Sequence, residues 1–299
     1  MAVRTQQPTS ITKRSEQTVK PVAIGLVDWR LPVKGPDAVR LACQLGAESI
    51  QLDLGGPGRA PWLDSKARLR AMCDALAETG ITPLAVSANV LNDIGITAGK
   101  GTPAAEQTQR VIRRALDAAA TIGAHLVFLP SFRASAIDSA AAFARTADVL
   151  HWACSEAKAR RLLLGTENVL CPEQLQRLIN AVSSSELRVV LDTGNPLTAG
   201  ISPCAVLQAA IPVLANQVHI KGVDDKNALS NNESVIVDTL NELYQRKFPV
   251  KALVLENDYR DDGIERLKAD LLWLKNHVAK YWDAPDVNAR PLTHVTPLF

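Results

Sequence analysis

Eight short apolar runs are spaced along the chain, and each is followed by a longer segment with helical periodicity. The runs are almost continuously apolar, which is typical of strands that are covered on both faces of a parallel sheet. The predicted strands span residues 22–29, 49–54, 82–88, 125–132, 161–167, 187–193, 217–223 and 250–256. Their spacing averages about 30 residues, which is the size of one βαβ unit.

The segments between these runs predict eight helices. They span residues 36–45, 64–79, 104–122, 138–158, 172–182, 203–214, 233–246 and 262–280. Pro36 opens the first helix and Gly46 follows it, as expected from the preferences of helix ends, and Asp64 is expected to cap the second. Eight uninterrupted βα steps predict an α/β fold, a single (β/α)₈ TIM barrel. An open doubly wound sheet is the alternative, but no G-x-G-x-x-G follows the first strand.

The predicted organisation is a flexible leader at 1–20, the barrel at 21–280 and a C-terminal tail at 281–299. The formal net charge is only +2, and no basic stripe is present, so a nucleic-acid partner is not expected. The longest apolar runs are too short to span a membrane. Five scattered cysteines and no secretion signal favour the cytoplasm. The tail could pack on a second subunit, so a homo-oligomer is left open, as is a barrel without catalytic activity.

Metal-competent side chains stand at the ends of the last four predicted strands. They are Glu167, Asp192, His219 and Glu256. The carboxyl ends of barrel strands meet at one mouth, and burying three carboxylates together is costly without a cation. Carboxylate oxygens with one imidazole suit one divalent ion, with Mn²⁺ expected and Mg²⁺ or Co²⁺ as alternatives.

The same strand ends carry a resemblance to a known family. The segments LGTEN, VLDTGN, VHIKG and LVLEND resemble the metal-binding strand ends of the xylose isomerase-like barrel superfamily, over roughly residues 21–280. The resemblance implies that the four residues bind the metal, and that Glu167 and Glu256 are catalytic and shuttle the proton. It also implies a substrate contact for Glu173, which stands six residues after the first ligand.

Other positions depart from the ketose 3-epimerases of that superfamily. Asn195 replaces a substrate-binding His, and Asp225 replaces an Arg. The pattern His219-x-Lys221 instead resembles inosose dehydratases and hydroxypyruvate isomerase-like members. Arg133, after the fourth strand, could meet a carboxylate or phosphate. Asn195, Lys221 and Arg133 are therefore the further candidates for substrate binding.

The predicted function is a divalent-metal-dependent isomerase or epimerase of a small sugar, cyclitol or keto-sugar, acting by proton transfer through a metal-bound enediolate. The alternative is a metal-dependent dehydratase or lyase of an inosose-like or oxidised sugar, in which Lys221 assists the leaving group. An abasic-site endonuclease is disfavoured because such enzymes need further ligands and a basic face. A Schiff base on Lys221 is disfavoured because neighbouring carboxylates raise the pKa of a lysine.

Overall fold

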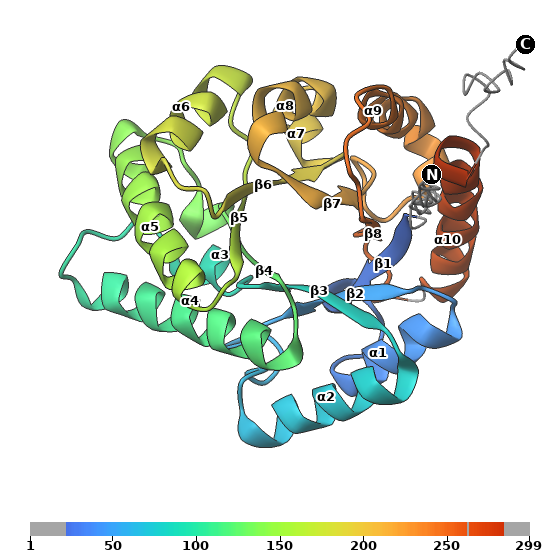
Figure 1. The fold of residues 1–299 in the computed structure, drawn as a ribbon, viewed down its shortest axis with the longest axis horizontal. Helices are drawn as coiled ribbons and strands as arrows, with labels where there is room; N and C mark the ends of the chain where they lie inside the picture. Colours follow the sequence, from blue (N-terminus) through green and yellow to red (C-terminus); the bar gives the residue numbers. More distant parts are fainter. Residues whose placement is uncertain (1–21, 262, 284–299) are drawn as a thin grey trace, which may run out of the picture.

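A closed ring of eight parallel strands forms the centre of the molecule, and the helices surround it (Figure 1). The computed structural model describes residues 22–261 and 263–283. The strands are β1 (Ala23–Val27), β2 (Ser49–Asp53), β3 (Thr82–Ser87), β4 (Leu126–Pro130), β5 (Leu163–Glu167), β6 (Leu187–Asp192), β7 (Leu214–Ile220) and β8 (Ala252–Leu255). They pair in chain order, and β1 closes the ring by pairing with β8. The predicted (β/α)₈ barrel is confirmed.

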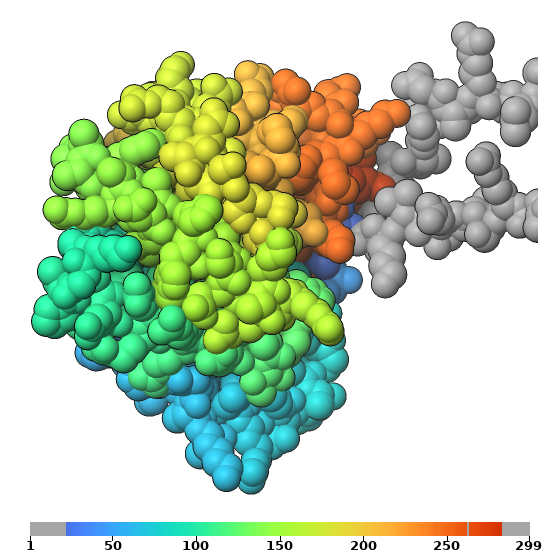
Figure 2. Space-filling model, turned by 60° about the vertical axis from the view of Figure 1, so that its left-hand side comes forward, coloured from blue at the N-terminus to red at the C-terminus, as the bar shows by residue number. Residues whose placement is uncertain are grey.

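The helices cover the outside of this ring. They are α1 (Pro36–Gln44), α2 (Lys66–Thr79), α3 (Leu91–Ile94), α4 (Pro103–Ile122), α5 (Ala140–Ala159), α6 (Pro172–Val182), α7 (Asn195–Thr198), α8 (Pro203–Ala210), α9 (Glu233–Gln245) and α10 (Ile264–Val278). Figure 2 shows the side on which α4, α5 and α6 form a closely packed outer surface. The sequence pattern did not predict the one-turn helices α3 and α7, because four residues are too few to show a helical period.

Two predicted helix ends are wrong, each for a local reason. Asp64 does not cap α2: its carboxylate accepts two hydrogen bonds from Arg114, at 2.6 and 2.7 Å, and Ser65 occupies the cap position. The helix predicted to run to residue 214 ends at Ala210. Pro212 lacks the N–H that would continue the α-helical hydrogen bonds, so Ile211–Val213 form a 3₁₀ turn instead. β7 then begins at Leu214, three residues before its predicted start at 217.

Strand register places the end of each strand at a common depth in the barrel. Asp192 pairs directly with His219, and Ile220 pairs with Leu255, so Glu256 follows one position beyond the end of β8. Gly165 leaves room for Phe128 of the neighbouring strand β4, because a Cβ at position 165 would lie 2.7 Å from the Cβ of Phe128.

None of the helices in residues 22–261 and 263–283 is long and apolar enough to cross a membrane. The predicted leader, residues 1–20, lies outside the described residues, as does the predicted tail from residue 284 onward. The boundaries given to the leader, barrel and tail stay predictions.

Candidate active site and metal centre

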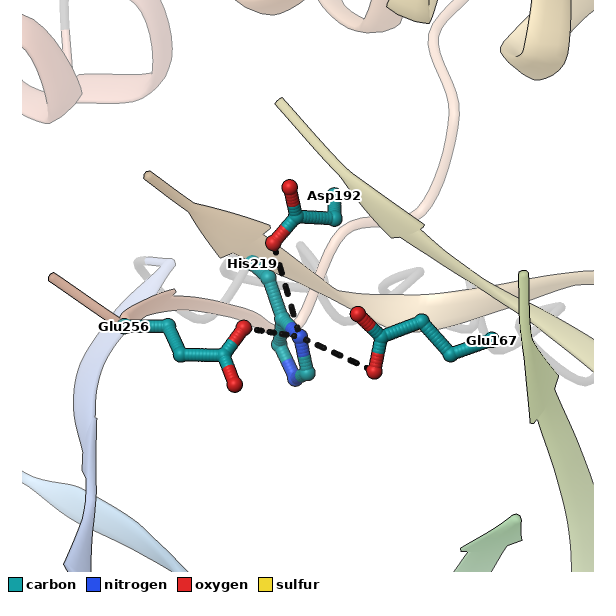
Figure 3. Close-up of side chains that lie close together, drawn as sticks. All are labelled: Glu167, Asp192, His219 and Glu256. Atoms are coloured by element: carbon teal, nitrogen blue, oxygen red, sulfur yellow. Dashed lines mark ion pairs between the residues drawn. The ribbon is translucent and has the colours of Figure 1, made fainter. Parts of the chain in front are cut away.

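Four side chains from β5, β6, β7 and the end of β8 converge at the mouth of the barrel (Figure 3). One ligand atom from each of Glu167, Asp192, His219 and Glu256 lies within 4.8 Å of all the others. All four residues are buried. The two glutamates approach the His219 ring from opposite sides, and Asp192 approaches from a third direction. The structure thus brings together all four residues predicted as metal ligands.

The donor atoms of this cluster fit a divalent cation. A cation with bonds of about 2.1 Å places its ligands up to ~4.2 Å apart, close to the spacing observed here. Within the described residues, Asp192 Oδ2, His219 Nδ1 and Glu256 Oε2 are buried and have no hydrogen-bond partner outside the cluster, although Nδ1 lies 3.0 Å from Glu256 Oε2. Buried polar atoms are normally paired, and each of these three atoms faces the centre of the cluster. The atoms that lack partners are therefore the ones that a cation would need.

The electrostatics of the cluster also favour a positive charge at its centre. Burial lowers the pKa of His219, but the carboxylates of Glu256 and Glu167 outweigh this effect and raise it well above its usual value. Burial raises the pKa of Asp192, and Glu256 and Glu167 raise it further. The pKa of Glu256 is lowered because His219 and Lys221 outweigh the effect of burial. Three buried carboxylates repel one another, so positive charge at the centre of the cluster would stabilise them.

His219 is oriented by a relay of side chains inside the barrel. Its Nε2 lies 2.9 Å from Gln51 Oε1 in β2, and Gln51 Nε2 donates a hydrogen bond of 2.8 Å to Gln217 Oε1 in β7. Because Gln51 presents its oxygen, Nε2 donates a proton to it, and Nδ1 is the ring nitrogen that faces the carboxylates. A bound metal ion would take the lone pair of Nδ1 in place of a proton. The edge of Phe128 packs against the imidazole, with ring centroids 5.5 Å apart.

We expect Gln51→Leu to weaken metal binding by about 10- to 100-fold, because an imidazole without its acceptor loses its tautomer and orientation. Titration with Mn²⁺ below the unfolding temperature of the variant measures this effect. Gln217→Leu is the matched control, since it removes a second buried amide but leaves the acceptor of His219 in place, and its effect should be smaller. Equal affinities for wild type and Gln51→Leu would contradict the relay.

Both predicted proton carriers are held by neighbouring donors. Trp29 Nε1 donates to Glu256 Oε1 at 3.1 Å, and Asn195 Nδ2 donates to Glu167 Oε1 at 2.8 Å. Burial lowers the pKa of Lys221, but Glu256 and Asp192 raise it above its usual value. A raised pKa keeps Lys221 protonated, whereas a Schiff-base nucleophile needs an unprotonated amine, so this direction argues against a Schiff-base role.

A cavity of about 310 Å³ opens above the cluster. Asn195, Lys221 and Arg133, three of the four residues predicted to bind substrate, line it. Glu173 does not: it is exposed in the first turn of α6, outside the lining of the cavity. The spacing of six residues therefore does not bring Glu173 to the site in this structure, because Glu173 belongs to the first turn of α6 and its side chain is exposed.

Sequence reasoning did not assign positioning roles to Gln51, Gln217 or Trp29. Gln51 alternates along β2 with apolar residues and reads as an ordinary strand position. Only the closed ring brings it across the barrel to β7, at a sequence separation of 168 residues from His219. An amide between the apolar residues Ile50 and Leu52 of a predicted strand was the one available signal.

The sequence matches the model of a protein family described as xylose isomerase-like TIM barrel, over residues 39–277. The chain belongs to the xylose isomerase-like TIM barrel family. It is also 43% identical, over 259 residues, to a 2-epi-5-epi-valiolone 7-phosphate 2-epimerase from Actinoplanes sp.. That match covers 84% of this chain and 93% of the relative.

Two solved structures of sugar epimerases have the same fold. A 3-keto-D-glucoside 4-epimerase from E. coli superposes with a TM-score of 0.68 and 15% identity, covering 85% of this chain and 99% of that structure. A D-allulose 3-epimerase from Methylomonas sp., in complex with D-allulose, superposes with a TM-score of 0.67 and 15% identity. That match covers 86% of this chain and 97% of that structure. The curated relative and the family match place this xylose isomerase-like barrel among the sugar isomerases and epimerases, as predicted, and the solved structures share its fold.

Proposed function

We propose that the chain epimerises a phosphorylated cyclitol or sugar ketone, inverting the stereocentre beside the ketone. The curated relative is named as a 2-epimerase of 2-epi-5-epi-valiolone 7-phosphate, and 43% identity over most of both chains supports a related substrate here. The observation that carries the proposal is the placement of Glu167 and Glu256 on opposite sides of one cluster of ligands. Inversion needs a proton taken from one face of a carbon and returned to the other.

Glu167, Asp192, His219 and Glu256 would hold the divalent ion, and Mn²⁺ is the expected species. When bound, the ion would polarise the ketone and make the neighbouring C–H more acidic. The expectations of a cytoplasmic location and of a homo-oligomer remain part of this proposal.

The side chains of this chain carry the proton. One glutamate removes the hydrogen beside the ketone, and the electron pair of the broken C–H bond moves onto the ketone oxygen. The other glutamate returns a proton to the opposite face of the same carbon. Trp29 and Asn195 keep the two carboxylates in orientation, and the Lys221 ammonium lies beside the pocket to stabilise the negative oxygen.

Incubation with 2-epi-5-epi-valiolone 7-phosphate in D₂O tests the proposal. We expect the 2-epimer to form with one deuterium on the inverted carbon, read by NMR, because a carboxylic acid exchanges its proton with solvent. A dehydratase would instead give a product lighter by one water, which mass spectrometry detects. Formation of that product, or inversion without deuterium from solvent at any stage of turnover, would overturn the proposed reaction.

A further inference from the structure

A second cavity, of about 320 Å³, adjoins the one above the metal ligands. The two cavities share Trp29, Arg59, Arg133 and Arg260 in their linings. Trp29 also hydrogen-bonds Glu256, so this wall connects the second cavity directly to the catalytic cluster. A substrate that fills the first cavity can therefore extend a substituent into the second.

The second cavity is lined by five basic side chains. They are Lys34, Arg59, Arg68, Arg133 and Arg260. Four of them follow different strands, β1, β2, β4 and β8, and the fifth stands on α2. Residues so far apart in the sequence meet here only because the loops after the strands share one end of the barrel. Such loops are where these barrels set substrate choice.

Within the described part of the chain, Arg68 has no carboxylate at ion-pair distance, and its buried Nε has no hydrogen-bond partner. Arginine is strongly favoured to pair its guanidinium when it is partly buried. Arg59 and Arg133 are held together by Asp93, at 2.8 and 2.5 Å from its two carboxylate oxygens. This bridge positions both guanidiniums at the cavity while leaving other N–H groups free to donate.

Cations outnumber anions around this cavity. Three carboxylates line it: Asp28, Asp53 and Asp93. Burial, with a contribution from Asp53, raises the pKa of Asp28 to about 8, so near neutral pH this carboxyl is largely protonated. Burial also raises the pKa of Asp53, which Arg59 partly offsets. Arg260 is paired with Asp258, at 2.5 Å. The other four basic groups still outnumber the ionised carboxylates and leave a net positive charge that favours a dianion.

We propose that this second cavity is the phosphate subsite of the enzyme, in which Arg59, Arg68 and Arg133 bind the phosphate of the substrate. The inference deepens the proposed function and rests on it for the identity of the ketone. It assigns specificity for phosphorylated substrates to loops after β1, β2, β4 and β8, separate from the four metal ligands. Arginine forks match phosphate oxygens and bind them through two N–H groups at once.

Titration calorimetry with inorganic phosphate tests the subsite without turnover. We expect wild type to bind phosphate in competition with the substrate, and Arg68→Gln to bind it about tenfold more weakly or worse. In kinetics, the variant should raise KM for the phosphorylated ketone far more than it lowers kcat. Arg110→Gln, an exposed arginine on α4 that lines neither cavity, is the charge-matched control and should behave as wild type.

Two results would contradict the subsite, and a third would separate it from the proposed reaction. Phosphate bound by the single metal ion instead would be unaffected by Arg68→Gln, because Arg68 does not line the first cavity. Acetate binding as tightly as phosphate would show a general anion site rather than a phosphate site. If wild type binds phosphate and Arg68→Gln does not, but wild type fails to turn over the ketone phosphate, the subsite stands and the proposed reaction fails.

Discussion

Glu256→Gln is expected to lower kcat by about 10²- to 10⁴-fold, the usual contribution of a positioned acid or base. The amide of Gln cannot accept the proton, whereas its oxygen can still accept the hydrogen bond from Trp29. Glu167→Gln should lower kcat by a similar factor, while the amide oxygen of Gln can still accept the hydrogen bond from Asn195. Rates are to be measured at saturating Mn²⁺, and metal content is to be determined on the same samples, so that loss of the ion is separated from loss of the base.

Exchange experiments sharpen this prediction. With one base removed, any remaining deuterium exchange should be confined to the epimer whose hydrogen faces the surviving glutamate. Glu106→Gln is the matched control, since Glu106 is exposed on α4 and lines neither cavity. Full epimerase activity in either active-site variant, or equal exchange from both epimers, would contradict the assignment of two bases.

Removal of divalent metal is expected to lower activity by about 10²-fold or more, because polarisation of a carbonyl by a bound cation supplies several kcal/mol. Addition of Mn²⁺ should restore activity. The ion should also stabilise the fold, because three buried carboxylates then face a positive charge in place of one another. At 100-fold excess over its dissociation constant, one bound ion contributes about 2.7 kcal/mol to the free energy of unfolding.

Thermal unfolding with and without Mn²⁺, together with metal analysis and activity on the same preparations, measures these effects. Protein dialysed without chelator is the control for handling. His219→Ala should show neither the activity nor the increase in unfolding temperature on addition of Mn²⁺. Chelated protein that contains no metal and keeps full activity would refute the metal-dependent mechanism.

Much of the fold and the centre of the site could be read from local patterns. Apolar runs near Leu164, Val190 and Leu253 identify strands covered on both faces, and their repetition predicts the barrel. Because parallel strands end at the same mouth, charged residues at four consecutive strand ends must approach one another. Glu167 and Glu256 were predictable for that reason, although they are 89 positions apart in the sequence.

The sequence by itself determined the eight strands, the longer helices, their order and the chemical types at the strand ends, because these depend on the side chains of each segment. Only the tertiary structure decided which side chains meet across the ring. Closure of β1 on β8 sets Gln51 against His219 and Trp29 against Glu256, and it gathers Arg59, Arg68 and Arg133 around one cavity. Glu173 illustrates the same limit, since its place in the first turn of α6, and not its spacing of six residues from Glu167, decides that it does not reach the mouth.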